Sequence, residues 1–578
     1  MGIPRFYRWL GETFPDAFST QETLEAEHVY IDMNTILHEV LRSMGPSPSE
    51  ARFLAAFLGR LDALLARATP RRSLFLALDG PAPTAKLPEQ RRRRRERVPA
   101  KDGPGRGRGS GKGRSRGKVP VCGGMSTNML TPGLPFMERL SDKLVEYCAE
   151  RLGLRSDVPA ETPKWPGCSH ATVSDASCAG EGEHKILVAL LCSEARDRAT
   201  LDGCAPRHVI IGSDSDLFLM PLGPRARPRH VAIAAPQARA GWRVCDVEAL
   251  RLGIRSQWQK FQSASSPRLA TLAAALSEST APSAALQEEE ELCLRRDFVL
   301  VSLMRGNDYL PPLASARDPD DLWLCYLKWR REKSATQGIV QRDCTAEAAE
   351  VPLTPKDESD HIAASERSPA EHLMFGQAPL ADFMSFCAGS EPVLPHIVGG
   401  KEQAIEGTAA YLCGLMWCLE TCVSGRCRNF HLRFPQSVAL CASAALIAEH
   451  LPSLAPDALS AARSPSPALA PISCAVAMLP VADVKELLFP TAPWLAPLLD
   501  PGAGMLREVA RLEACTECAA LTAALDAVAP GSKKAAKRSK ALEVHRRQHS
   551  GIEAVPLREL DAEVRRLCGA AAPGAPPR

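Results

Sequence analysis

The sequence predicts an α/β protein with a mostly parallel, twisted sheet flanked by helices, and two observations support this fold class. Apolar runs of strand length occur at 28–32, 73–79, 208–214 and 297–303. Helical patterns lie between them, such as 136–152, where an apolar residue recurs at every fourth position. Because continuous apolar strands alternate with helices, both faces of the sheet are expected to be covered. We place this α/β core at about residues 1–325.

Composition narrows the class of protein. The chain has 578 residues, of which 45% are hydrophobic and 24% charged, so wholesale disorder is excluded. No run of 18 apolar residues exists, and the start MGIPRFYRWL lacks the apolar core of a secretory signal. Twenty cysteines without regular spacing are typical of reduced intracellular thiols. We therefore expect a protein that is neither secreted nor associated with a membrane.

Charge is concentrated in one segment. The net charge is only +3, but residues 91–119 alone carry a net charge of +11. A block of this size is typical of a solvated interaction segment, and nucleic acid is the polyanion that best matches it.

The chain divides by composition. A Gly/Arg/Lys/Ser-rich insertion at about 99–127 has no means of forming a core and is expected to be disordered. A low-complexity linker covers about 262–290, and a helical, Ala/Leu-rich region follows at 370–528. Residues 529–578 are interpreted as a basic, disordered tail. Its KKAAKRSK segment is either a nuclear localisation signal or simply solvated.

Acidic residues follow the predicted strands and occupy one strand–helix turn. They are Asp32, Asp79, Glu181, Glu183, Asp214, Asp216 and Asp308. The carboxyl ends of parallel strands line the crevice where ligands bind, although any single Asp after a strand is as often a helix cap. Seven converging carboxylates repel one another until cations neutralise them. Mg²⁺ prefers oxygen ligands, and two such ions clamp both oxygens of a phosphodiester displacement, so the pattern predicts a metal-dependent nuclease.

A basic helical face follows the second of these acids. Lys86, Gln90, Arg93 and Arg94 share one face of a helix, with Pro88 in its first turn. Arg binds phosphate bidentately, so this face is a candidate pocket for a terminal phosphate. A localisation signal or a solvated charge run is the alternative.

Seven ordered segments carry a resemblance. They are MGIPRFYRWLGETFP, YIDMNTILH, LALDGPAPTAKLPEQRRRR, LTPGLPFMERL, AGEGEHKI, GSDSDLFLM and DFVLVSLMRGNDYLPP. Together they resemble the XRN (Xrn/Rat) family of 5′→3′ exoribonucleases over about 1–325, and more faintly to about 501. The resemblance implies a PIN-like 5′ nuclease core followed by the family's helical second block at 370–528.

The resemblance also implies roles. It assigns the seven acids to catalysis through two Mg²⁺ ions, or Mn²⁺ in their place. It assigns Lys86, Gln90, Arg93 and Arg94 to a pocket for a 5′-monophosphate, and His38 to stacking on the first base. The implied activity is processive hydrolysis of single-stranded RNA to nucleoside 5′-monophosphates, in RNA decay or processing; no protein partner is implied.

Some residues depart from the family pattern. Thr35, Ser213 and Ser215 replace a Gly and two apolar residues without removing an acid. After Gly425 the family's Trp-rich stretch is replaced by RCRNFHLRFP. Phe430 is a candidate stacking partner for His38, but Leu432 is expected at the stacking position, which predicts a weaker grip on RNA and reduced processivity.

Two other functions stay open. One is a structure-specific 5′ nuclease of the flap-endonuclease type, which shares carboxylates at strand ends. The other is an RNA-binding member of the family with weakened catalysis. The basic face argues against the first, and the complete acidic set argues against the second.

Two remaining features concern the cysteines near the end of the chain and the cell compartment. Cys515 and Cys518 form a CTEC with no second ligand pair nearby, so ordinary thiols are expected rather than zinc. The nucleus is favoured over the cytoplasm, because the tail is basic and the chain lacks the added carboxy-terminal modules of the largest family members.

Overall fold

We describe the fold from a computed structural model of the chain. The structure describes residues 2–3, 5–45, 48–96, 124–157, 159, 161–200, 206–225, 228–237, 241–263, 284–314, 319–333, 338–343, 372–389, 400–434, 442–455, 465–513, 515–526, 533–548 and 556–571. Residues 97–123, which include most of the expected basic insertion, lie outside the described part of the chain. Within the described part of the chain, none of the helices has both the length and the apolar character needed to cross a membrane.

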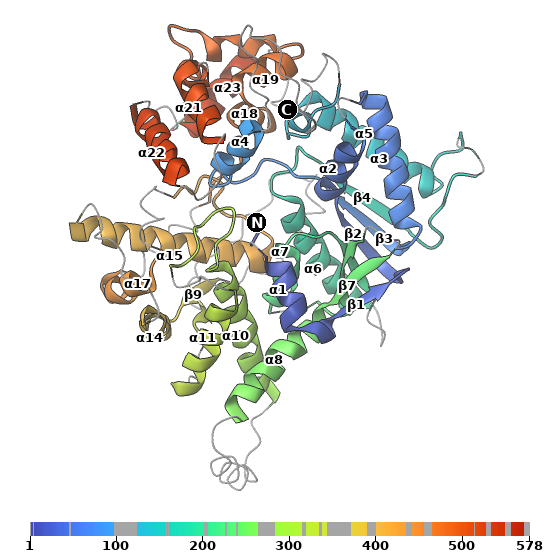
Figure 1. Cartoon of the computed structure of the whole chain (residues 1–578). Coiled ribbons are helices and arrows are strands. Elements are labelled where there is room, and N and C mark those ends of the chain that lie inside the picture. The colour runs from blue at the N-terminus through green and yellow to red at the C-terminus, as the bar shows by residue number, and fades with distance from the viewer. Residues whose placement is uncertain are drawn as a thin grey trace, which may run out of the picture.

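A seven-stranded sheet organises the amino-terminal half, and its strand order is β1-β7-β6-β5-β2-β3-β4 (Figure 1). The strands are β1 Phe18–Gln21, β2 Ala26–Asp32, β3 Pro70–Ala77, β4 His170–Ser174, β5 His208–Ile211, β6 Val231–Pro236 and β7 Trp242–Asp246. Five neighbours, from β6 to β4, pair in parallel, and β7 and β1 add antiparallel pairings at one edge. The predicted mostly parallel sheet is confirmed.

Helices cover both faces of the sheet. In β2, Val29 and Ile31 join one hydrophobic cluster and Tyr30 joins the other, as the two-residue period of a strand requires. The first cluster is covered by α2 Met33–Ser43, α3 Glu50–Leu65 and α5 Pro135–Arg151. The second is covered by α1 Phe6–Thr13, α6 Gly182–Thr200, α7 Asp216–Leu219 and α8 Val247–Ser263, and it continues into the following helices.

The expected strand at 297–303 is wrong. These residues end the long helix α10 Ala284–Leu303, which packs between α8, α11 Pro319–Glu332 and α15 Gly400–Ser424. A short apolar run does not distinguish a strand from a helix that is buried on all sides. The same helix takes up the end of the expected 262–290 linker.

The following region is largely helical, with α14 Gln377–Ala388, α17 Ala444–His450, α18 Pro471–Met478, α19 Val481–Asp483 and α20 Arg507–Glu513. Short strands β8 Val340–Arg342 and β9 Leu373–Phe375 pair antiparallel. Short 3₁₀ and π turns are Pro15–Ala17, Thr127–Met129, Met220–Leu222, Leu451–Ser453, Val484–Leu488 and Pro493–Leu499.

A third hydrophobic cluster ties the amino-terminal domain to the end of the chain. Leu87, at the start of α4 Leu87–Glu96, packs in this cluster with residues from 469–509. Three residues of α23 Leu557–Ala571 are buried in the same cluster: Leu560, Val564 and Leu567.

The expected disorder of the 529–578 tail is therefore wrong for the residues that the structure describes. Helix α22 Lys533–Gln548 precedes α23, and the apolar residues of α23 recur at helical spacing and are buried.

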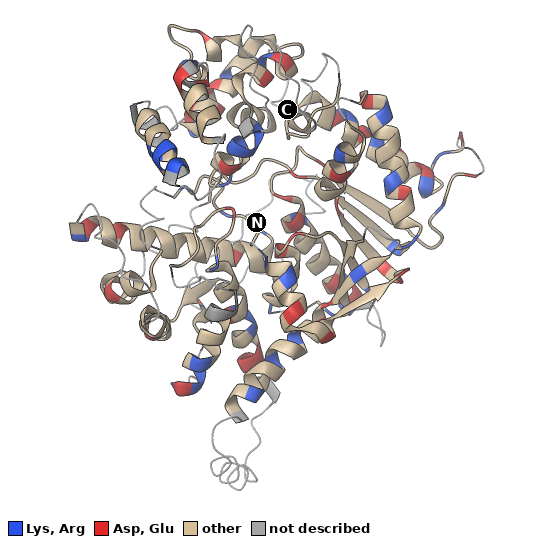
Figure 2. Cartoon of the chain, in the orientation of Figure 1, with Lys and Arg blue, Asp and Glu red and all other residues tan. Residues whose placement is uncertain are grey.

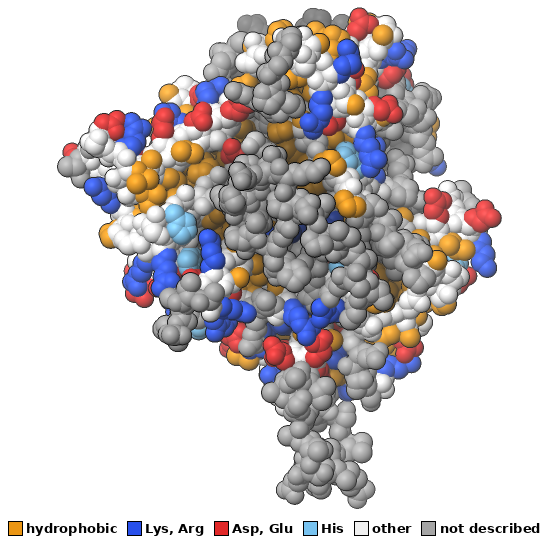
Figure 3. All heavy atoms as spheres, turned by 180° about the vertical axis from the view of Figure 1, so that it is seen from behind, with side chains coloured by type: hydrophobic (Ala, Val, Ile, Leu, Met, Phe, Trp, Pro, Cys, Tyr) orange, Lys and Arg blue, Asp and Glu red, His pale blue; other side chains and the backbone are white. Residues whose placement is uncertain are grey.

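Charged residues are spread over many elements (Figure 2). Seen from behind, charged side chains of both signs alternate with hydrophobic ones on the surface (Figure 3).

Candidate active site

Asp32 ends strand β2 and has two roles in the local structure. Its Oδ1 accepts a hydrogen bond from Asn34 N at 3.1 Å, which caps α2. Its Oδ2 accepts a hydrogen bond from Thr35 Oγ1 at 2.8 Å. The side chain is only 2% exposed. Asp32 is thus a helix cap, as an Asp directly after a strand often is. The same carboxylate also belongs to the acidic set described below.

Asp79 lies two residues beyond strand β3, and the backbone there approaches a second turn closely. Gly80 N donates to Gly180 O at 2.9 Å, and a Cβ at position 80 would lie 1.7 Å from Cys178 O. Asp79 Oδ1 accepts from Gly182 N, the first residue of α6, at 2.8 Å. The Asp-Gly pair therefore places the Asp79 carboxylate at the start of α6.

Glu181 and Glu183 converge because the helix begins between them. Glu181 lies directly before α6 and Glu183 lies in its first turn, and both are buried. Lys86 Nζ and the Tyr309 hydroxyl both donate hydrogen bonds to Glu181. The charges of both residues act on the buried Asp79, so this i, i+2 pair lies around one carboxylate.

Asp214 and Asp216 follow strand β5. Asp216 is the first residue of α7 and is 1% exposed, whereas Asp214 is exposed to solvent. Between them, Ser215 Oγ accepts from Ile3 N at 2.8 Å, so this departure from the family pattern ties the start of the chain to the site.

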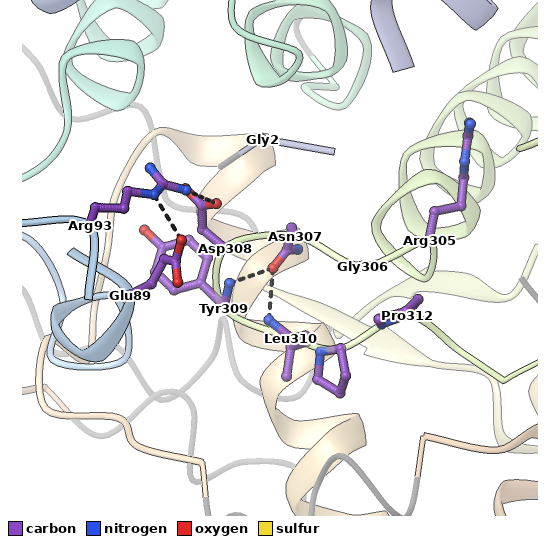
Figure 4. A pocket seen from close by; sticks show the side chains of 11 residues that line it. Gly2, Glu89, Arg93, Arg305, Gly306, Asn307, Asp308, Tyr309, Leu310 and Pro312 are labelled. Atoms are coloured by element: carbon purple, nitrogen blue, oxygen red, sulfur yellow. Dashed lines mark hydrogen bonds and ion pairs between the residues drawn. The ribbon is translucent and has the colours of Figure 1, made fainter. Parts of the chain in front are cut away.

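Asp308 comes from a tight turn after α10. Gly306 has a φ of +86°, and Asn307 Oδ1 accepts from the backbone N of Tyr309 and of Leu310 at 2.9 Å each. Figure 4 shows that this turn directs Asp308 towards Arg93. Asp308 therefore reaches the site from a helix–turn unit rather than from a strand.

The electrostatics show that the seven carboxylates act on one another. Burial, followed by the charges of Asp214, Glu183 and Asp79, raises the pKa of Asp32 well above its usual value. Burial and Glu183 raise the pKa of Asp79 to about 6.

The other acids are coupled in the same way. Burial raises the pKa of Asp216 to about 7, and Glu183 adds to this effect. Burial also acts on Asp308, but Lys86 and Arg93 outweigh it and lower the pKa of Asp308.

Divalent cations fit this donor set. All seven side chains offer carboxylate oxygens, which are the ligands of hard cations such as Mg²⁺. Burial, with the neighbouring carboxylates adding to it, raises the pKa values of Asp32 and Asp216. The pKa of Asp308 is lowered, because Lys86 and Arg93 outweigh burial there. Bound cations would favour the charged form of the buried acids.

Lys86 and Arg93 border the carboxylates. Lys86 is 7% exposed; besides Glu181, its Nζ lies 3.5 Å from Asp308 Oδ2. Although burial acts in the opposite direction, Glu181 and its neighbours raise the pKa of Lys86 well above its usual value, so it stays charged. Arg93 donates to Asp308 Oδ1 at 2.9 Å and to Glu89 Oε1 at 2.8 Å. Arg93 also lines a cavity of about 500 Å³ together with Gly306 and Tyr309 (Figure 4).

The other two members of the basic face lie on α4 as predicted but have different surroundings. Arg94 Nε donates to the buried Thr131 Oγ1 at 3.0 Å. The Oε1 atom of Gln90 is buried, and no described residue supplies it with a hydrogen bond. Lys86 and Arg93 are thus the members that reach the carboxylates.

Two residues of the site were missed from the sequence. Tyr309 donates to Glu181, and Lys185 Nζ donates to Leu78 O and Asp175 O at 2.8 Å each. In the sequence, Tyr309 stands out only because it follows Asp308, and Lys185 only because it lies two residues after Glu183. Position in the chain does not show which way a side chain points.

The predicted stacking residues are half-buried. His38 lies on α2, six residues after Asp32 in the chain. The Phe430 segment packs beside the basic face, because Thr84 donates to Phe430 O at 2.7 Å and to Leu432 O at 3.0 Å. The Leu432 side chain packs against the core. A role in base stacking stays a prediction for these residues.

Known proteins match the part of the chain that carries most of the acids. Residues 1–233 match the family model described as XRN 5'-3' exonuclease N-terminus, a range that contains six of the seven acids. This amino-terminal domain belongs to the XRN family. Asp308, the seventh acid, lies beyond the matched range of this XRN domain.

Relatives of the chain carry exoribonuclease names. The chain is 26% identical over 337 residues to 5'-3' exoribonuclease 1 of Schizosaccharomyces pombe, covering 54% of this chain and 22% of the relative. It is 30% identical over 259 residues to 5'-3' exoribonuclease 2 of Arabidopsis thaliana, covering 38% and 24%. The matched region therefore spans about a quarter or less of either relative.

A solved structure of the catalytic core of Rad2 in complex with DNA substrate is 13% identical, with a TM-score of 0.30, and covers 67% of this chain and 95% of that chain.

Proposed function

We propose that this chain is a divalent-metal-dependent 5′→3′ exoribonuclease that hydrolyses single-stranded RNA from a 5′-monophosphate end. Its products would be nucleoside 5′-monophosphates. The observation that carries the proposal is the set of carboxylates around Lys86 and Arg93, which pair with Glu181 and Asp308 and whose charges act on one another. The exoribonuclease names of the relatives support the substrate class.

The seven acids would hold two Mg²⁺ ions, or Mn²⁺ in their place. Bound ions supply a nucleophile from water and stabilise the leaving oxygen of a phosphodiester. The residues around the acids fix the oxygens in place. Gly182 N binds Asp79, Thr35 and Asn34 bind Asp32, and Tyr309 binds Glu181. Such hydrogen bonds from outside the ligand set orient the ligands and help to decide the affinity for the ion.

The ion pairs of Lys86 and Arg93 link metal binding to recognition of the RNA end. In the structure the side chains of Lys86 and Arg93 both pair with Asp308, and Lys86 also pairs with Glu181. Metal ions on these carboxylates would compete with Lys86 and Arg93 for the same oxygens. The Lys86 and Arg93 side chains would then be available to a phosphate beside α4, which an Arg can bind bidentately. Gln90 and Arg94 would complete the pocket on the same face of α4.

RNA grip and processivity would be lower than in relatives with a Trp at the corresponding place. Leu432 packs against the core and offers no aromatic face, while Phe430 is half-buried beside Thr84. Stacking on an aromatic ring contributes about 1–3 kcal/mol per base.

The test is Mg²⁺-dependent nucleotide release from one RNA that carries either a 5′-monophosphate or a 5′-triphosphate, with Asp214→Asn as the control variant. We expect mononucleotides from the monophosphate RNA alone, and none from the variant. Binding without release from either RNA would contradict the proposal in favour of an RNA-binding protein. Cleavage of DNA flaps in preference to RNA would favour a flap-type nuclease.

A further inference from the structure

The end of the chain contains a cluster of ligand-type side chains far from the carboxylates in sequence. Cys515 lies directly before helix α21 Thr516–Asp526, and Cys518 lies in its first turn. His545 lies in the last turn of α22. The ligand atoms of Cys515, Cys518 and His545, one from each residue, all lie within 4.8 Å of one another.

The distances suit a tetrahedral zinc ion. Cys515 Sγ lies 3.4 Å from His545 Nε2. In a tetrahedral site with usual Zn–S and Zn–N bonds, this separation is about 3.6 Å. The backbone N of Cys518 points at Cys515 Sγ, at 3.5 Å. Such an N–H favours a thiolate at the start of a helix.

The imidazole is oriented as a metal ligand. Its Nε2 faces the thiols, and its Nδ1 lies 3.5 Å from Glu517 Oε2. Metal-ligating histidines usually donate their other ring N–H to a carboxylate or carbonyl, which fixes the tautomer.

We propose that Cys515, Cys518 and His545 bind one Zn²⁺ ion that joins the start of α21 to the end of α22. Two thiolates with an imidazole favour zinc over the hard cations that suit the carboxylate site. The described residues supply three ligands to the ion.

The ion would hold a basic helix in a fixed orientation. Lys534, Lys537 and Lys540 are exposed on α22, which lies beside α21 (Figures 1 and 2). Just before the cluster, Glu513 accepts from Arg91 of α4 at 2.8 Å. The end of α20, just before the hairpin, is thus tied to α4, the helix that carries the proposed phosphate-binding face.

The test measures zinc in the full chain, purified under reducing conditions without added metal. We expect about one zinc per chain in the wild type and at least about a tenfold loss in Cys515→Ser and in His545→Ala. Cys568→Ser, in the neighbouring α23, is the matched control and keeps its zinc. Replacement of zinc by Co²⁺ should produce the visible bands of thiolate-bound cobalt, and these bands should disappear in the same variants.

A second measurement uses the wild type alone and does not depend on variants that fold. Trypsin cleavage after the lysines of α22 should become about tenfold faster or more when a zinc chelator is added, because a bound ion suppresses local opening. A reduced full chain without zinc, without thiolate–cobalt bands and with unchanged proteolysis would overturn the proposal. Neither measurement requires nuclease activity, so this inference can fail while the proposed function holds, and the reverse.

Discussion

Replacing Asp79 by Asn should stabilise the protein when no divalent cation is present. The folded-state pKa of Asp79 is about 6, against an ordinary value of 3.8, because of burial and the nearby charge of Glu183. A carboxyl with a raised pKa favours the folded state when protonated. Its contribution is therefore fully present below about pH 4 and is lost as the pH rises through about 6. Asn keeps an acceptor for the Gly182 N–H bond and carries no charge.

The magnitude follows from the shift. A difference of about two pKa units corresponds to roughly 3 kcal/mol at pH 7. Solvent reaches part of the Asp79 side chain and screens the repulsion, so we expect a gain of about 1–3 kcal/mol in the free energy of unfolding.

The assay is urea unfolding in EDTA at pH 7 and at pH 4, followed by the same measurement with Mg²⁺. The variant should be the more stable protein at pH 7 in EDTA, and the difference should shrink at pH 4. With Mg²⁺ the wild type should gain more stability than the variant, since ligand binding to the folded state adds to its stability.

Asp175→Asn is the matched control for this prediction. Hydrogen bonds from Ser177 outweigh burial and lower the pKa of Asp175, so its replacement should destabilise the protein slightly under the same conditions. If Asp79→Asn were less stable than the wild type in EDTA at pH 7, the repulsive carboxylate cluster would be refuted.

Further predictions concern the neighbours of the cluster. Lys86→Met should cost about 3–5 kcal/mol of stability in EDTA, because it leaves buried carboxylates unpaired, and a loss below about 1 kcal/mol in urea unfolding would contradict this. Arg93→Ala should raise KM for 5′-monophosphate RNA about tenfold, which corresponds to the loss of one charged hydrogen bond. An equal rise in KM for 5′-hydroxyl RNA would show that Arg93 does not bind the terminal phosphate. Leu432→Trp should lengthen the processive run on RNA by adding about 1–3 kcal/mol of stacking; unchanged run lengths in a single-turnover trap assay would place position 432 away from the base. Gly80→Ala should destabilise the protein by about 3 kcal/mol or more, because its Cβ would lie 1.7 Å from Cys178 O, and an unchanged Tm would argue against this close approach.

Much of the site was predictable because its signals are local. Strands β2, β3 and β5 are continuous apolar runs, and each leads within a few residues to an acid. Parallel pairing then brings those acids to one edge, without any further information about packing. The basic face could be predicted in the same way, since helical spacing relates Arg93 on α4 to Lys86, the residue directly before this helix.

Other features depended on packing that a single segment does not encode. The run at 297–303 belongs to a helix because α10 is surrounded by other helices, and periodicity disappears when every face is buried. Helix α23 is ordered because its apolar residues complete the third hydrophobic cluster.

The sequence by itself determined the α/β class, the acids at the strand ends and the basic face, since each depends on short-range order along the chain. Only the tertiary structure decided how these groups pair. Lys86 contacts Asp308, which lies more than 200 residues further along the chain. His545 contacts Cys515, which lies 30 residues before it. Such pairs form because helices and turns from separate segments pack together. Their side-chain directions follow from that packing and not from local spacing.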